Sequence, residues 1–290
     1  MRRILALLLL AGVITACEDV IEVEVPSEAP RLVIDAIIRV DTSQAFIQPE
    51  IRVTQTASFF DAVQPVSNIT QMTLAALNEN GTGQEFMVLE ETEPGSGIYR
   101  DPEPFPVDTL LSGPLILQIE HEDRLYFART EFVPSVEINR LEQGDDILFS
   151  EDDTEVIVEI TDTADQENFY VFDFGFSEFL TVQDQFFNGQ TFEFSYFYEE
   201  ELETGQELQV SILGVDQGFF DYMTLLIEQT QNDGGVFETP VATVRGNIFD
   251  VTDLDNDQVV DNVSQPDVFP LGYFAVVQEF KATLTLEEQE

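Results

Sequence analysis

The chain has 290 residues, of which 43% are hydrophobic, and its 57 acidic and 11 basic residues give a formal net charge of −46. This length and hydrophobic content suit one large or two ordinary globular domains. A polyanion without a basic cluster repels phosphates, which excludes a broad nucleic-acid-binding face. One cysteine and one histidine exclude a disulfide framework and the usual zinc sites.

The N-terminus has the pattern of an export signal. Residues 1–16 read MRRILALLLLAGVITA, with Arg2 and Arg3 ahead of an apolar run. The run is too short for a stable helix across a bilayer core of about 30 Å, and it is typical of a cleaved signal peptide. The stretch Ile14–Cys17 resembles a bacterial lipobox, in which the cysteine thiol is acylated. We therefore predict that residues 1–16 are removed and that Cys17 carries the lipid anchor.

An acidic tether is predicted at residues 17–29. Glu18 and Asp19 directly follow the cysteine, which resembles the surface-export signal of Bacteroidota lipoproteins. A solvated tether without such a signal explains the same residues, and both interpretations stay open. We expect an exported protein, lipid-anchored in the outer membrane and exposed on the cell surface.

Residues 30–134 are predicted to form an immunoglobulin-like β-sandwich. Short β-branched or alternating runs are separated by turn residues, as in antiparallel sandwiches. His121 lies in the predicted turn of a hairpin and is expected to be solvated. The expected strands are Arg31–Val40, Glu50–Thr56, Thr70–Asn78, Phe86–Glu90, Leu115–Glu120 and Leu125–Thr130.

Residues 135–290 are predicted to form a second, aromatic-rich β-domain with a helix at about 216–232. Apolar residues recur there at spacings of three and four, Asp216 is a candidate N-cap, and two glycines follow the end. Strands are expected at 136–141, 155–161, 208–213, 241–248 and 271–280. The fold class is therefore all-β, with two antiparallel β-sandwich-type domains and one helix in the second.

Aromatic side chains concentrate between Phe169 and Tyr198. A predicted strand carries Phe172, Phe174 and Phe176 on one face, and a turn at Asn188-Gly189 leads to an adjacent strand with four more aromatic residues at alternate positions: Phe192, Phe194, Tyr196 and Tyr198. Such alternation favours a core over a sugar-binding platform. Tyr196 and Tyr198 are the candidate ligand contacts, because a phenol needs a polar partner or water.

An acidic loop has the spacing of a calcium site. Carboxylates at alternate loop positions supply the hard oxygens that Ca²⁺ prefers. The pattern departs from calcium loops at Gln258, where glycine is usual, and at Ser264, where a glutamate is usual; Asp250, Asp267 or backbone carbonyls could complete the site. A solvated loop is the alternative interpretation. The candidate ligands are Asp253, Asp255, Asp257 and Asp261.

Several segments together resemble a family of Bacteroidota lipoproteins classed as domain of unknown function 4249. They include the Asp184–Gly189 turn (DQFFNG), Pro240–Ile248 (PVATVRGNI) and Leu271–Phe274 (LGYF), besides the lipobox. The resemblance implies an accessory role beside a TonB-dependent outer-membrane transporter, and it supplies no catalytic residues.

The favoured hypothesis is a non-enzymatic surface lipoprotein that helps such a transporter capture a ligand or assemble. A structural or adhesive envelope module is one alternative, and a carboxylate-based hydrolase is another. No nucleic-acid partner is expected, and calcium is the one cofactor considered. With a net charge of −46, the acidic side chains should repel one another and strain the folded state. A salt-rich exterior of the kind that halophiles inhabit would screen this repulsion, and calcium bound at acidic clusters such as 253–261 is the alternative explanation.

Overall fold

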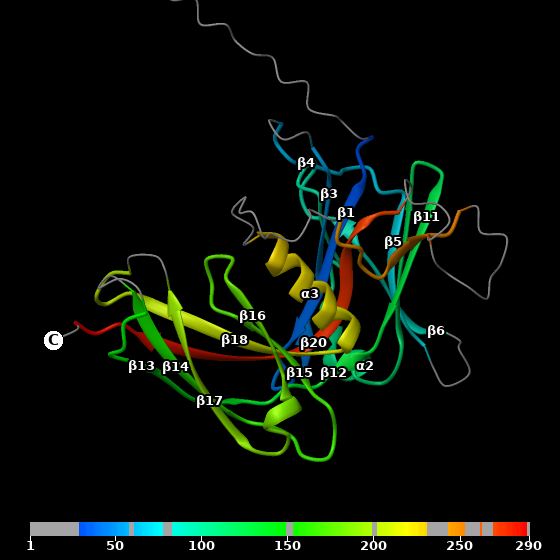
Figure 1. Cartoon of the computed structure of the whole chain (residues 1–290). Helices are drawn as coiled ribbons and strands as arrows, with labels where there is room; N and C mark the ends of the chain where they lie inside the picture. The colour runs from blue at the N-terminus through cyan, green and yellow to red at the C-terminus, as the bar shows by residue number, and fades with distance from the viewer. Residues whose placement is uncertain are drawn as a thin grey trace, which may run out of the picture.

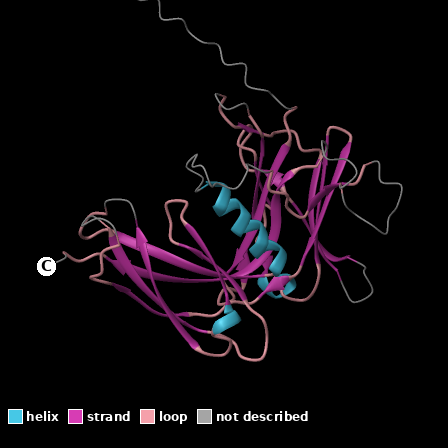
Figure 2. Cartoon of the chain, in the orientation of Figure 1, coloured by secondary structure: helices cyan, strands magenta, loops and turns pink. Residues whose placement is uncertain are grey.

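The computed structural model describes residues 29–57, 61–77, 83–148, 153–198, 202–230, 243–252, 262 and 269–288. The fold is all-β, as predicted, with several antiparallel sheets and a helix, α3, at Gln217–Thr230 (Figures 1 and 2). The signal peptide, Cys17 and the acidic loop lie outside these residues. Within them, no helix is long and apolar enough to cross a membrane.

The first half contains a five-stranded sheet. The predicted hairpin is confirmed as β10 and β11, which pair in register from Leu115↔Thr130 to His121↔Arg124. Along the sheet, the strands are β19 (Ile248–Asp250), β11 (Arg124–Thr130), β10 (Leu115–His121), β5 (Gln71–Leu77) and β6 (Gly83–Val88).

A ten-stranded sheet runs through both halves of the molecule. Its main path is β16 (Phe179–Gln183), β15 (Phe169–Asp173), β18 (Glu207–Val215), β20 (Leu271–Thr285), β1 (Leu32–Val40), β3 (Glu50–Gln55), β8 (Ile98–Arg100) and β7 (Glu90–Glu91). Beside this path, β12 (Phe132–Val133) pairs with β20 and β4 (Gln64–Pro65) pairs with β3.

Strand β20 joins the two halves. Its residues 271–278 pair in parallel with β1, and its residues 279–285 pair antiparallel with β18. Figure 1 shows this long red strand bending from one half into the other. Strand β19 likewise pairs with β11, so the segment predicted as a second domain, 135–290, also contributes strands to the first half.

A three-stranded sheet completes the second half. It consists of β13 (Ile138–Gln143), β14 (Thr154–Thr161) and β17 (Thr191–Tyr198), in that order. The small elements are β2 (Phe46–Ile47) paired with β9 (Phe105–Pro106), the one-turn helix α2 (Val107–Leu110) and the 3-10 helix η1 (Asp184–Phe186).

Alternation along the strands separates the cores. In β1, Ile34, Ala36 and Ile38 are at most 2% exposed and pack with the five-stranded sheet. Burying each branched aliphatic side chain contributes about 1.5–3 kcal/mol. Ile37, between Ala36 and Ile38, packs instead against the core beneath α3, because successive side chains point to opposite faces of a strand.

Helix α3 covers the other face of the large sheet. Asp216 caps its N-terminus, accepting a 2.7 Å hydrogen bond from the backbone N–H of Phe219. Phe219 and Met223 are buried, and the Phe219 ring lies 4.9 Å from that of Tyr273 on β20. The predicted helix is thereby confirmed, and it packs where the two halves meet (Figure 1).

A charged cluster lies at the same junction. The Arg39 guanidinium on β1 donates to Asp173 on β15 at 2.7 Å and to Glu279 on β20 at 3.2 Å. Lys281 lies 3.1 Å from the other oxygen of Glu279. Burial alone would lower the pKa of Arg39, but the two carboxylates raise it above its ordinary value.

The aromatic strands are not neighbours in one sheet, so the predicted adjacency is wrong. Strand β16 follows β15 in the chain and pairs with it, while β17 pairs with β14 in the opposite sheet. Phe176 also leaves the predicted face, because β15 ends at Asp173 and Phe176 lies beyond it with φ 50°. Phe172 and Phe174 meet the β17 aromatics across the sandwich.

Gly246 and Gly272, which belong to the last two segments of the family resemblance, make close backbone contacts. A Cβ on Gly246 would lie 1.7 Å from the carbonyl oxygen of Gly272, and one on Gly272, where φ is 95°, would lie 2.0 Å from the carbonyl oxygen of Ile34. A larger residue does not fit at either position. The described residues 243–247 form no strand, and β19 begins at Ile248, at the end of the predicted strand 241–248.

Candidate functional site

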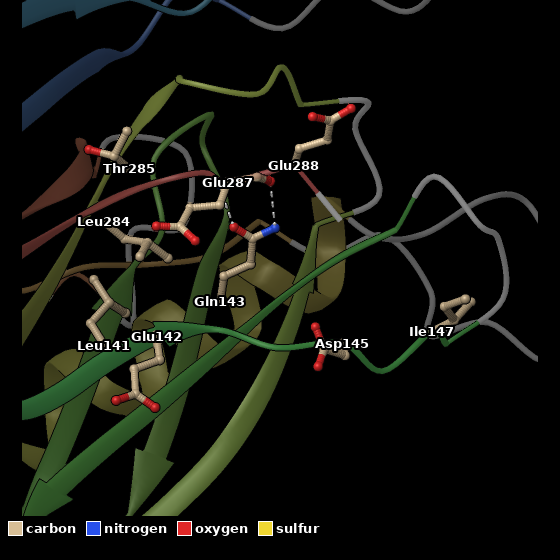
Figure 3. A pocket seen from close by; sticks show the side chains of 9 residues that line it. All are labelled: Leu141, Glu142, Gln143, Asp145, Ile147, Leu284, Thr285, Glu287 and Glu288. Atoms are coloured by element: carbon tan, nitrogen blue, oxygen red, sulfur yellow. Dashed lines mark hydrogen bonds between the residues drawn. The ribbon is translucent and has the colours of Figure 1, made fainter. Parts of the chain in front are cut away.

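A hollow lies where the edges of β13 and β20 approach each other. It has a volume of about 780 Å³, and we call it the edge groove. Leu141 on β13 and Leu284 on β20 form its apolar floor and pack against the core of the second half. Ile147 extends the apolar surface and is 59% exposed. Figure 3 shows the two leucines side by side, with Ile147 at the far end.

Four acidic residues form the rim of the edge groove. They are Glu142, Asp145, Glu287 and Glu288. Glu142 is paired at 3.0 Å with Arg140, which also contacts Glu159 and Glu193. Within the described part of the chain, no ion pair is found for the other three carboxylates, and all three residues are exposed. The rim is therefore an acidic surface with little compensation by basic side chains.

The side chain of Gln143 connects the two edges of the groove. Its Oε1 accepts from the backbone N–H of Glu287 at 2.8 Å, and its Nε2 donates to the Glu287 carbonyl oxygen at 3.3 Å (Figure 3). These are the bonds that a neighbouring strand would make with Glu287. The amide therefore takes the place of one residue of an added strand.

The predicted ligand contacts lie in the core of the second half, away from the edge groove. Tyr198 is fully buried and donates to the carbonyl oxygen of Phe174 at 2.8 Å. Burial raises its pKa well above the ordinary tyrosine value, and the nearby Glu178 adds to the effect. Tyr196 is half-buried, stacks on Phe174 and donates to Glu178 at 2.6 Å. Tyr198 therefore does not reach the surface, because its phenol has an acceptor inside the protein.

The other predicted site residues lie outside the described residues. They are Cys17 and the candidate calcium ligands Asp253, Asp255, Asp257 and Asp261. The calcium and lipid sites therefore stay predictions from the sequence. Elsewhere, the described residues contain no group of three or more His, Cys, Asp or Glu side chains that could hold a metal ion.

Asp250 and Asn262, on either side of the acidic loop, are joined by hydrogen bonds. Asn262 is buried, and its side chain accepts from the backbone N–H of Asp250 and donates to its carbonyl oxygen, both at 2.9 Å. The Asp250 carboxylate contacts Arg124 at 2.5 Å and accepts from the N–H of Thr252 at 3.0 Å. Asp250 therefore neutralises an arginine in this structure, whereas the sequence suggested it as a further calcium ligand.

The Asp184–Gly189 turn is built on two buried carboxylates. Asp162 accepts from the phenol of Tyr170 at 2.5 Å and from the N–H of Gly189 at 2.7 Å. Asp184 accepts from the side chain of Asn188 at 2.8 Å. Burial, followed by the Asp162 hydrogen bond, raises the pKa of Tyr170. These residues hold the turn rigidly, so the motif has a structural role.

His121 is buried rather than solvated. It is the last residue of β10, is 6% exposed, and its Nδ1 has no hydrogen-bond partner among the described residues. Its Nε2 lies 3.9 Å from Glu122. The prediction failed because β10 extends one residue past Glu120, and alternation then points His121 inward with Leu117 and Ile119.

The sequence reasoning missed the edge groove. Leu141 and Leu284 have the alternation of ordinary strand residues, and that pattern does not reveal that their strands lie at facing sheet edges. The buried Asp184 could have been noticed from the sequence, since it begins the Asp184–Gly189 segment of the family resemblance.

A family model described as "Domain of unknown function (DUF4249)" matches residues 18–281. No curated protein matches the chain. Two solved structures are similar over 67% of it: trypsin-activated alpha-2-macroglobulin from Escherichia coli, at 12% identity and a TM-score of 0.22, and Salmonella alpha-2-macroglobulin reacted with methylamine, at 14% identity and the same TM-score. The chain spans 15% and 14% of those two chains, and TM-scores this low carry no argument.

Proposed function

The chain belongs to the DUF4249 family, and from this premise we propose that it is a non-enzymatic lipoprotein, anchored through Cys17 at the cell surface, that binds a protein partner. The partner in this proposal is a TonB-dependent outer-membrane transporter, which the protein helps to capture a ligand or to assemble.

One observation carries the binding role: the edge groove combines an apolar floor with an acidic rim. Leu141 and Leu284 supply the floor, and Asp145, Glu287 and Glu288 supply negative charge at the rim that no ion pair among the described residues compensates. Apolar surface beside polar groups is typical of protein interfaces. A catalytic role has less support, because the one histidine, His121, is buried away from solvent and the groove carboxylates are exposed.

The location is tested by lipid labelling. Cells that produce the full chain are grown with an alkyne-bearing fatty acid, and the label is detected on the purified protein. We expect label on the wild type and none on Cys17→Ser, which should also leave the membrane fraction. Equal labelling of both proteins would rule out Cys17 as the anchor.

The partner is tested by affinity capture of the lipidated protein from detergent-solubilised envelopes of its own bacterium at low and moderate salt. Mass spectrometry should identify a TonB-dependent barrel protein among the captured proteins. If neither salt concentration yields one, the transporter role is wrong, and a structural or adhesive module becomes the better description.

A further inference from the structure

We propose that the edge groove binds an extended, lysine- or arginine-rich segment of a partner protein by strand addition to β20. The inference rests on the proposed function for the existence of a protein partner. It adds the chemistry of the bound segment and the strand that receives it. In this mode, backbone hydrogen bonds supply affinity and alternate side chains supply specificity.

Beyond Gln278, no strand of the described residues pairs with the outer edge of β20. Strand β1 pairs with β20 only as far as Gln278, and from Glu279 onward the strand partner is β18, on one edge. Just beyond the strand, the N–H of Leu286 donates to the carbonyl oxygen of Gln206 on the β18 side at 2.9 Å. Backbone groups of successive residues point to opposite edges, so those of Thr285 and Glu287 are directed toward the groove.

Gln143 shows that this edge accepts strand-type hydrogen bonds. Its amide donates to and accepts from the backbone of Glu287, which is the reciprocal pairing that a bound strand would continue. Thr285, two residues earlier, lines the groove, and no strand of the described residues pairs with it on that side. A bound segment would therefore begin next to Gln143 and run along β20 past Thr285.

The side chains of the groove specify the sequence of the bound segment. An added strand presents alternate residues to the floor formed by Leu141, Leu284 and Ile147, which favours apolar residues at every second position. The intervening residues face a rim where Asp145, Glu287 and Glu288 have no basic partner in the described part of the chain. A cationic residue is complementary there, and the net charge of −46 steers such a segment toward the protein.

Binding is measured by isothermal titration calorimetry with three capped octapeptides. The first alternates lysine and valine, the second alternates glutamate and valine, and the third is the lysine peptide with N-methyl groups on alternate backbone amides. The lysine peptide should bind, and rising NaCl should weaken it through screening. The glutamate peptide should not bind, and N-methylation should abolish binding because it removes the hydrogen-bond donors on one edge of the peptide.

Matched variants separate the groove from the general charge. The groove variant combines Asp145→Asn, Glu287→Gln and Glu288→Gln, and the control combines Glu90→Gln, Glu93→Gln and Glu103→Gln, which are exposed acids of the first half. Because an exposed ion pair changes affinity by about two- to fivefold, the groove variant should weaken binding about tenfold or more. The control should change it by less than about twofold. Equal weakening by both variants would overturn the groove assignment.

The backbone contribution is tested at Thr285. Thr285→Pro removes the outward N–H and leaves the β18 side of the ladder intact, so it should weaken the lysine peptide about tenfold. Thr285→Ala keeps the N–H, so it should weaken binding far less than Thr285→Pro does. Thermal unfolding shows whether each variant folds. If Thr285→Pro does not fold, the N-methylated peptide decides, and equal binding of methylated and unmethylated peptides would rule out strand addition.

The outcomes distinguish this inference from the proposed function. Capture of a transporter, together with no peptide binding, would overturn the strand-addition mode and leave the function standing. Groove-specific peptide binding without capture of a transporter would support strand addition and contradict the transporter role.

Discussion

The side-chain amide of Asn247 forms two hydrogen bonds with the backbone of Phe274. Nδ2 donates to the Phe274 carbonyl oxygen and the Phe274 N–H donates to Oδ1, both at 2.8 Å. The pair links the start of β19, in the five-stranded sheet, to β20 in the large sheet. Asn262 with Asp250 and Gln143 with Glu287 repeat this arrangement. In each case an amide side chain satisfies backbone groups where regular strand pairing stops.

Asn247→Asp should destabilise the protein by about 1–3 kcal/mol, because the variant loses the donor to the Phe274 carbonyl and places a carboxylate beside it. Urea unfolding at neutral pH measures the change. Asn139→Asp, at an exposed position of β13, adds the same charge and should change the free energy of unfolding by less than about 0.5 kcal/mol. Equal losses in the two variants would mean that added charge, and not the lost donor, is responsible.

Gly272→Ala should be far more damaging than Gly95→Ala. Both glycines have positive φ, 95° and 89°, so both substitutions strain the backbone. A Cβ at Gly272 meets the carbonyl oxygen of Ile34 at 2.0 Å, whereas one at Gly95 meets nothing within 4 Å. We expect Gly95→Ala to cost about 1–2 kcal/mol and Gly272→Ala to cost several more or to prevent folding. Thermal unfolding temperatures that fall equally would contradict the close approach of β1 and β20.

Alkaline pH should destabilise the fold partly through Tyr126. Burial, and then the Asp250 carboxylate, raise its pKa to about 12 in the folded protein, against about 10 in an unfolded chain. Between these values the folded state binds more protons, so the free energy of unfolding falls as pH rises from about 10 to about 12, and the contribution is fully present below about pH 10.

Tyr126→Phe should therefore reduce the alkaline loss of stability by about 1–3 kcal/mol. The measurement is urea unfolding of both proteins at several pH values from about 9 to about 12. Tyr198 and Tyr273, whose pKa values are also raised by burial, should keep part of the pH dependence in the variant. Parallel curves for the two proteins would show that Tyr126 does not ionise differently on folding.

Calcium and bulk salt should stabilise the protein in different ways. If the acidic loop binds calcium, low-millimolar calcium at constant ionic strength raises the unfolding temperature, with about 2.7 kcal/mol gained at one hundred times the dissociation constant. Screening of the net charge instead grows gradually toward about 1 M NaCl. The combined variant Asp253→Asn, Asp255→Asn and Asp257→Asn should lose the calcium response and keep the response to NaCl. A calcium response that survives in the variant would place any calcium elsewhere.

The local elements could be predicted from the sequence because their signals are local. Alternation in β1, the hairpin of β10 and β11, and the N-cap of α3 at Asp216 each depend on residues close in the chain. The arrangement of the candidate site was harder to predict from the sequence. The alternating aromatics at Phe174 and Tyr196 correctly indicated a core, yet they pack across two sheets where one had been expected.

What the sequence determined by itself is the all-β class, the family and the unusual charge of −46. Only the tertiary structure decided that β20 connects both halves, that Tyr198 and His121 are buried, and that the edges of β13 and β20 form a groove. The physical reason is that alternation records which face of a strand is buried, but not which strand lies beside or across from it. Those partners come from residues far apart in the chain, such as Ile34 and Gly272.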